Sequence, residues 1–332
     1  MKKSIFLFMV VFSFGGFAQT KYSTVAEDFI TFHDNISAAE RMYKNDSLLQ
    51  AYAKFDIAFE GYKGAVNPGH YFKAALCAIK IKEEFKALYF LEKAIINGYE
   101  LDSANRKMIS FYNQNTKKEF VENFPKWEDI RVAARNANWE SELLTTHESN
   151  KKYNSSKYTV ALEYCSACMK NKACNKTAPD FTSKYKLVKE KMTADSLSAA
   201  QLLNQAQQLG FPTVKLVGKK ANEVAHSILL NYDADKKNER LDGFLTKALI
   251  DGNISPEFYA LLVDRRNVTN GLLPEFYEPI TGYEKTIGKE VAVVNKKRRT
   301  IGLYSIKLAT SASPKSKDPN AKKVAYKGLY DY

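Results

Sequence analysis

The stretch that decides the fold is Ala87-Leu88-Tyr89-Phe90-Leu91-Glu92-Lys93-Ala94, in which small and large apolar residues follow each other at helical spacing. Its Ala87, Leu91 and Ala94 have counterparts with the same spacing 29 residues earlier, at Ala58, Tyr62 and Ala65. Alanine at such positions lets two antiparallel helices approach closely, while the larger residue fills the groove between them. The pattern predicts packed helical hairpins with a 29-residue repeat.

From about 25 to 145, apolar residues recur every three or four positions, which predicts helices throughout. Pro68 and Gly98 are placed as a helix start and a helix stop. Over 60 to 100 residues, and most clearly at 87–94, this part resembles degenerate tetratricopeptide repeats, although the period is shorter than the usual ~34 residues. The resemblance implies stacked helix pairs, which commonly hold a peptide or protein on their concave face.

Residues 146–190 are polar and carry three of the four cysteines, so they are interpreted as a linker with some helix around 159–169. A second domain over 191–310 then opens with a helix capped by Thr193 or Asp195 and stopped at Gly210. Two more helices are predicted from an apolar stripe and from a Ser-Pro start, at 241–249 and 256–262.

The second domain resembles an uncharacterised bacterial domain family of unknown function that is found in exported proteins. The resemblance covers about 193 to 308 and rests on five short motifs: Gly210-Phe211-Pro212-Thr213, Leu216-Val217-Gly218-Lys219-Lys220-Ala221, Ile228-Leu229-Leu230, Leu262-Val263-Asp264-Arg265 and Arg298-Arg299-Thr300-Ile301-Gly302-Leu303. This chain departs from the family pattern at Asn231-Tyr232, where a Gln-His pair is expected, and around 277–282. The family has no settled biochemical role, so the resemblance implies a helical domain and no particular activity.

The amino terminus reads as a signal peptide over 1–18. Lys2 and Lys3 precede the apolar run Ile5–Phe14, and Gly16-Phe17-Ala18 places small residues before a cut at Gln19. No cysteine follows the run to carry a lipid, and no later stretch approaches the ~20 apolar residues of a membrane span. We therefore expect a soluble protein that is periplasmic or secreted.

The formal charge of +13 is compatible with acidic partners, such as an anionic envelope polymer or lipid headgroups, but the favoured alternative is that lysines on exposed helix faces keep the protein soluble. An exported chain is a poor candidate for binding nucleic acid. Residues 311–332 are rich in Ser, Lys, Pro and Asn without periodicity, which predicts a disordered basic tail.

The cysteine cluster predicts a disulfide, because exported proteins meet an oxidising compartment. We expect Cys174 to pair with Cys165 or Cys168, and Cys77, on an apolar helix face, to stay reduced. The Cys165-x-x-Cys168 spacing also leaves open a dithiol redox couple, although the strand that precedes a thioredoxin-like site is missing. Met169 excludes a c-type haem, whose axial histidine would stand at that position.

Glu223-x-x-His226 places a carboxylate and an imidazole one turn apart, half of a motif that di-iron bundles use twice. With one copy no metal site is predicted, and His226 is interpreted as the partner of Glu223 at a helix surface. If the protein is an enzyme, the candidate catalytic residues are His226, Tyr232, Asp264 and Arg265. For Arg265, a salt bridge with Asp264 or a neighbouring carboxylate is the favoured alternative.

Gly218-Lys219-Lys220 lacks the Ser or Thr of a phosphate loop, so a nucleotide site is rejected and no cofactor is predicted. Lys219 and Lys220 at a helix start are candidates for binding an anion, with an ordinary N-terminal turn as the alternative.

These observations predict an all-α protein, with a tetratricopeptide-like domain over 19–145, a linker over 146–190 and a compact helical domain over 191–310. The leading hypothesis is a non-enzymatic envelope protein that binds a protein or peptide on the concave face of its repeats. The alternatives are a hydrolase-like enzyme with its site in the C-terminal domain, and a dithiol redox protein.

Overall fold

A computed structural model describes residues 27–171, 174–232, 239–269, 272–278 and 284–306 of the 332-residue chain. Within these ranges every regular element is a helix and there is no strand, so the all-α prediction is confirmed. In the same ranges, no helix is both long enough and apolar enough to cross a membrane. The predicted signal peptide at 1–18 and the predicted tail at 311–332 lie outside the described residues.

The helices follow one another in the order α1 (Glu27–Lys44), α2 (Leu48–Gly61), α3 (Pro68–Lys80), α4 (Glu84–Ile96), α5 (Ser103–Met108), α6 (Gln114–Ala133), α7 (Ala137–Asn150), the 3₁₀ turn η1 (Lys151–Asn154), α8 (Ser156–Lys170), α9 (Pro179–Leu209), α10 (Val214–Tyr232), α11 (Glu239–Ile250), α12 (Pro256–Thr269) and α13 (Glu284–Thr300).

Helices α1 to α4 form two antiparallel hairpins, α1 with α2 and α3 with α4, which pack together through α2 and α3. Both hairpins turn in the same way, through a residue with positive φ: Asp46 at 58° and Lys82 at 67°. In each turn the next residue, Ser47 or Glu83, donates its N–H over 2.8 Å to the carbonyl five positions earlier. The two turns lie 36 residues apart, which defines the true repeat.

The predicted 29-residue repeat is therefore wrong in register. At 36 residues, Ala51, Phe55 and Ala58 of α2 correspond to Ala87, Leu91 and Ala94 of α4, and all six are at most 2% exposed. The prediction failed because 29 and 36 differ by seven residues, which is two helical turns and leaves the helix face unchanged. Helix α2 ends at Gly61, so Tyr62 and Ala65 lie beyond it, and Ala65 is exposed.

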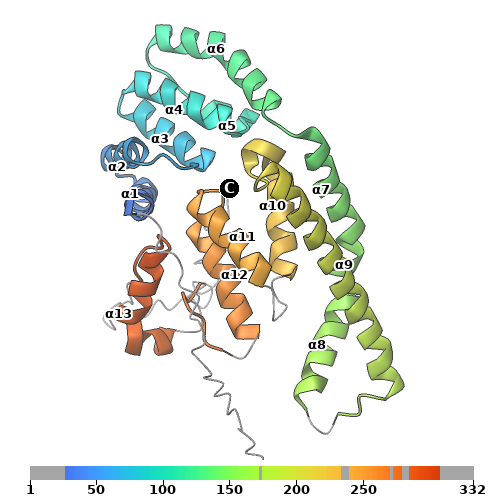
Figure 1. Cartoon of the computed structure of the whole chain (residues 1–332). Helices are drawn as coiled ribbons and strands as arrows, with labels where there is room; N and C mark the ends of the chain where they lie inside the picture. Colours follow the sequence, from blue (N-terminus) through green and yellow to red (C-terminus); the bar gives the residue numbers. More distant parts are fainter. Residues whose placement is uncertain (1–26, 172–173, 233–238, 270–271, 279–283, 307–332) are drawn as a thin grey trace, which may run out of the picture.

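The inner side of the molecule is filled by its own C-terminal helices. Figure 1 shows α1 to α9 as an arc, with α10 to α12 inside it and α13 beside α1. The Ala65 N–H donates to the Asp251 carbonyl over 3.3 Å, and the Asn136 N–H donates to the Leu216 carbonyl over 2.8 Å. One continuous apolar core contains residues from 29 to 303. The two predicted domains thus share a core, and the arc has no free concave side at these contacts.

Close backbone approach explains why two glycines stand at these contacts. A Cβ at Gly98 would come within 2.8 Å of the Lys215 backbone nitrogen, and a Cβ at Gly252 within 2.5 Å of the Ala65 carbonyl oxygen. Both glycines also have positive φ, which side chains disfavour. Gly98 follows α4 and Gly252 follows α11, so both glycines lie where the arc meets the helices inside it.

The segment predicted as a linker is instead a helical hairpin, made by α8 and α9 after the turn η1. Helix α9 is continuous from Pro179 to Leu209, so the predicted helix start at Thr193 or Asp195 and the domain boundary at 190 fall inside it. Pro179 occupies the first turn, where its missing N–H costs nothing, and Gly210, with φ of 86°, ends the helix as predicted. The polar composition of 146–190 reflects solvent exposure of a thin hairpin, not loop structure.

Candidate functional site

The structure does not pair His226 with Glu223. The His226 ring stacks on the Phe258 ring at 4.1 Å between centroids, and its buried Nε2 has no hydrogen-bond partner among the described residues. Burial lowers the pKa of His226 to about 4, so the ring is neutral at physiological pH. Glu223 lies at the surface, 3.9 Å from the Lys219 ammonium. His226 is therefore a packing residue on α10, not the surface partner of a carboxylate.

Asp264 holds a backbone segment in place. It is 2% exposed, and its carboxylate accepts N–H bonds from Glu275, Phe276 and Glu278 over 2.6, 2.8 and 2.6 Å. Burial raises the pKa of Asp264, and these three bonds oppose the rise by favouring the ionised form. The carboxylate thus connects α12 to the segment after it, while Arg265 is exposed.

Arg298 on α13 completes this buried polar network. Its fully buried guanidinium donates to the carbonyls of Phe276 and Tyr304 over 2.7 and 2.9 Å and pairs with the Glu278 carboxylate at 3.2 Å. The sequence motif Arg298-Arg299-Thr300-Ile301-Gly302-Leu303 contained this residue without indicating its role. The role depends largely on Phe276 and Glu278, which are 22 and 20 positions away, and no local pattern reveals these contacts.

The anion-binding candidates Lys219 and Lys220 are exposed on α10, just after a break in the helix at Gly218. Gly218 has φ of 75°, and a Cβ there would come within 2.9 Å of the Arg135 guanidinium. Arg135 in turn forms ion pairs with Glu100 and Glu140. Packing against Arg135 therefore explains the glycine without an anion.

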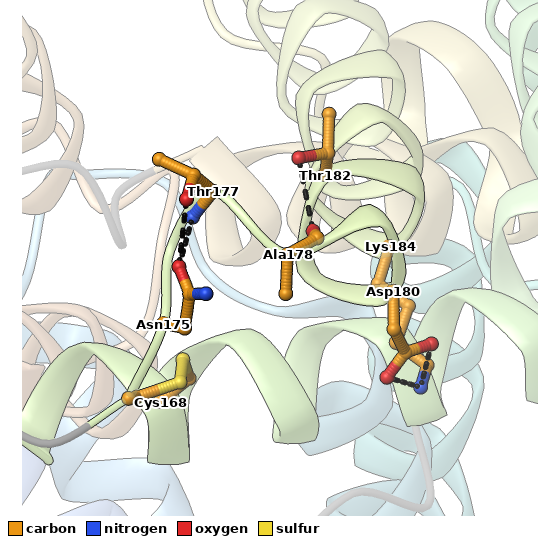
Figure 2. The surroundings of a disulfide bond; sticks show 8 residues. Cys168, Asn175, Thr177, Ala178, Asp180, Thr182 and Lys184 are labelled. Atoms are coloured by element: carbon orange, nitrogen blue, oxygen red, sulfur yellow. Dashed lines mark hydrogen bonds and ion pairs between the residues drawn. A yellow bond between two sulfur atoms is a disulfide. The ribbon is translucent and has the colours of Figure 1, made fainter.

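The cysteines are divided between a disulfide and two buried thiols. Cys168 bonds to Cys174, one of the two pairings that the sequence left open, and Figure 2 shows the surroundings of this bond. Cys165 and Cys77 are free and buried. Burial raises the pKa of both thiols, that of Cys77 to about 12. Neither free cysteine has the lowered pKa of a reactive thiolate.

A small polar cavity lies where α7, η1, α9 and α10 meet, lined among others by His147, Lys191, Asp195, Ser198 and Asn231. Its volume is about 30 Å³, enough for one or two waters and too small for a substrate. The Lys191 ammonium pairs with Asp195 at 2.8 Å, and the Asn150 amide donates to the Ser198 hydroxyl over 2.8 Å. The polar groups of this cavity thus largely satisfy one another.

The two outer helices of the repeats expose a set of large apolar side chains. We call it the outer face and define it by Leu49 and Ile57 on α2 and by Phe85 and Tyr89 on α4, which are 61%, 52%, 78% and 46% exposed. Leu49 and Phe85 are equivalent in the 36-residue repeat. The Lys86 ammonium on α4 pairs with Asp56 on α2 at 2.8 Å, so the two helices lie side by side. Sequence analysis missed this face because the wrong register hid the equivalence.

None of the candidate catalytic residues lines the polar cavity, which contains neither His226, Tyr232, Asp264 nor Arg265. Tyr232 packs partly buried against the main core. Within the described ranges, no group of three or more His, Cys, Asp or Glu side chains is placed to hold a metal ion.

Comparison of the chain with protein families, with curated proteins and with solved structures finds no match.

Proposed function

We propose that this protein is a non-enzymatic, exported binding protein that holds a protein or peptide partner on the outer face. The observation that carries the proposal is the exposure of four large apolar side chains on adjacent helices. Single exposed apolar residues are normal on proteins, whereas several of them on two helices that an ion pair holds side by side favour an interaction site. The proposal keeps the binding hypothesis of the sequence and moves the site from the concave face of the repeats to the outer face.

The partner segment that fits best is an amphipathic helix. Phe85 and Tyr89 are four residues apart on α4 and so stand one above the other, and Leu49 and Ile57 repeat this two turns apart on α2. A helix laid against this pair of ridges would present apolar residues at three- and four-residue spacing. Tyr89 adds a hydroxyl at the edge, which suits a surface that is apolar in the middle and wet at the rim.

Export supports the same proposal. The Cys168–Cys174 disulfide suits an oxidising compartment outside the cytoplasm, consistent with the signal peptide expected at 1–18. The tetratricopeptide-like hairpins and the resemblance of 193–308 to a domain of exported proteins agree with an accessory role in the envelope. The hydrolase-like alternative has weaker support, because none of its candidate residues lines the polar cavity. The dithiol alternative has weaker support, because Cys168 is bonded to Cys174 and not to Cys165, whose thiol is buried.

Photo-crosslinking tests the proposal in cells that export the full-length protein. A photoreactive amino acid in place of Phe85 should yield a discrete protein adduct, and the same amino acid in place of Val132, which is 59% exposed on α6, should not. Leu49→Ser should abolish the adduct from position 85, whereas Val121→Ser, at a residue 62% exposed on α6, should leave it. Absence of an adduct, or identical adducts from positions 85 and 132, would refute the proposal.

A further inference from the structure

The α8–α9 hairpin concentrates positive charge. Residues 151–192 contain ten lysines and three carboxylates, a formal charge of +7 within a chain whose total is +13. In the described structure three of these lysines pair with carboxylates: Lys151 with Glu148, Lys184 with Asp180 and Lys191 with Asp195. Lys152, Lys157, Lys176, Lys186 and Lys189 are exposed and have no acidic partner among the described residues. The hairpin therefore presents a cluster of uncompensated charge.

Four lysines of the hairpin make cation–π contacts with tyrosines. The distance from the ammonium nitrogen to the ring centroid is 4.9 Å for Lys152 and Tyr153, 4.9 Å for Lys157 and Tyr158, 4.0 Å for Lys184 and Tyr164, and 5.1 Å for Lys189 and Tyr185. Cation–π attraction holds such charges near the surface of the hairpin and lowers the entropy lost when they bind.

The same hairpin also exposes apolar side chains between its lysines. Val160, Leu162, Met169 and Met192 are 54%, 45%, 51% and 52% exposed. The interior of the hairpin is a separate small core around Cys165 and Phe181, so these four residues lie outside it. Exposed apolar residues among lysines do not help to bind a purely ionic polymer, but they do help at a lipid interface.

The hairpin is free to reach a surface. Helix α8 packs mainly on α9 and η1, and Figure 1 shows the α8–α9 hairpin projecting from the lower end of the arc. The Cys168–Cys174 bond ties the end of α8 to the segment before α9. Because the hairpin projects from the arc and the disulfide holds its end together, its basic side chains can contact a flat surface without a change in the main core.

We propose that the α8–α9 hairpin binds the surface of an anionic phospholipid bilayer, with lysines on the headgroups and the exposed apolar side chains in the interface. Lysine clusters are attracted to anionic leaflets, and exposed apolar side chains among them gain free energy by burial at the boundary of headgroups and acyl chains. The uncompensated charge alone would also suit an acidic polymer, and the four exposed apolar residues favour the bilayer. This surface is distinct from the outer face, so either proposal can fail without the other.

Vesicle co-sedimentation of the mature protein tests the proposal. We expect binding to vesicles of phosphatidylglycerol and phosphatidylethanolamine, weakened by salt, and little binding to vesicles of phosphatidylcholine alone. Lys186→Glu with Lys189→Glu should lower the partition coefficient at least about tenfold. Lys117→Glu with Lys126→Glu makes the same charge change at exposed sites of α6 and should lower it much less. Circular dichroism checks that each variant is folded.

A second pair of variants separates the bilayer from an acidic polymer. Leu162→Ser with Met192→Ser should weaken binding to the anionic vesicles several-fold and leave binding to soluble dextran sulfate unchanged. Val121→Ser with Val132→Ser on α6 is the matched control and should change neither. Three results would overturn the proposal: equal binding to both kinds of vesicle, equal losses for hairpin and control variants, or binding to dextran sulfate without binding to vesicles.

Discussion

The repeats at α1 to α4 and the hairpin at α8 and α9 are both antiparallel helix pairs, yet they are stabilised differently. In the repeats, Ala51, Ala87 and Phe90 are fully buried in a core that continues into the C-terminal helices. In the hairpin, a small core around Phe181 is supplemented by the Cys168–Cys174 bond and by lysine–tyrosine contacts at the surface. A helix pair can thus be stabilised in two ways: by burial of its apolar side chains on several sides, or, where the pair is exposed to solvent, by a disulfide bond in addition to a small core.

The difference also separates the roles of the two regions. A helix pair with a shared core opens only when the whole protein unfolds, whereas a pair with its own small core can open alone. The repeats therefore supply a rigid platform for the outer face. Helix α8 and the first half of α9 form a unit with its own small core and binding surface, whereas Ala199, Leu202 and Ala206 of α9 belong to the main core. The following predictions test this division.

Truncation of one phenylalanine in each region should give the largest contrast. Phe90→Ala removes a fully buried ring that lies 5.5 Å from the Phe59 ring, and should lower the free energy of unfolding of the whole protein by about 3 to 5 kcal/mol. Phe181→Ala should leave the global denaturation midpoint nearly unchanged and speed hydrogen exchange only in α8 and the first half of α9, because the second half of α9 belongs to the main core. A comparable global loss from both variants would contradict the division.

Enlarging a buried alanine should have a smaller effect. Ala87→Leu adds three carbons to a residue with no exposure and should destabilise the protein by ~1 to 3 kcal/mol through strain. Ala53→Leu, the same change at an exposed position of α2, should stay within about 0.5 kcal/mol. Lys86 is unsuitable as a control because it pairs with Asp56. Equal midpoints in chemical denaturation would mean that the seam between the repeats is not tightly packed.

Removing the disulfide should affect the hairpin alone. Cys168→Ala with Cys174→Ala releases a loop whose ends are six positions apart, and chain entropy assigns about 2 kcal/mol to such a closure. Amide exchange in α8 should accelerate accordingly, while α3 keeps its protection. Thiol labelling of denatured, unreduced wild-type protein should find two free cysteines, Cys77 and Cys165. Four labelled cysteines would show that the bond does not form.

Mild acid should weaken the repeats before the hairpin. Burial, assisted by the nearby His70, lowers the pKa of His33 to about 3 from an ordinary value of 6.5. A depressed histidine pKa stabilises the fold above pH 6.5, and this stability is lost as the pH falls towards 3. The loss should reach about 1 kcal/mol near pH 5.5. Residues 151–192 contain no histidine. Exchange measured against pH should therefore show α1 losing protection while α8 is unchanged; the reverse order would contradict the assignment.

The helix starts at proline and the helix end at Gly210 were predictable, because they depend on the backbone conformation of single residues. Pro68 and Pro256 begin α3 and α12, and Gly210 ends α9 with positive φ, all as the sequence indicated. The hairpin turns were not predictable in this way, because Asp46 and Lys82 adopt positive φ without being glycine. Because the two hairpin turns could not be located from the sequence, repeats of 29 and 36 residues, which differ by about two turns of helix, could not be told apart.

The candidate site was less predictable than the fold. Their residue types made His226 and Asp264 candidates for catalysis. In the structure the His226 ring stacks on Phe258, and the Asp264 carboxylate accepts hydrogen bonds from three backbone N–H groups. The outer face had no motif at all, since its residues are ordinary apolar residues that the fold leaves uncovered.

By itself the sequence determined the helical class, several helix ends at proline and glycine, and the clustering of charge and cysteine, because periodicity, backbone preference and composition act within a few residues. Tertiary structure alone decided that α10 to α13 fill the arc, that Arg298 meets Glu278, and that Cys168 meets Cys174 in preference to Cys165. Those outcomes depend on which surfaces pack together although they are far apart in the chain. The free energy that favours one packing over another is the sum of many such contacts, and no short stretch of sequence contains them.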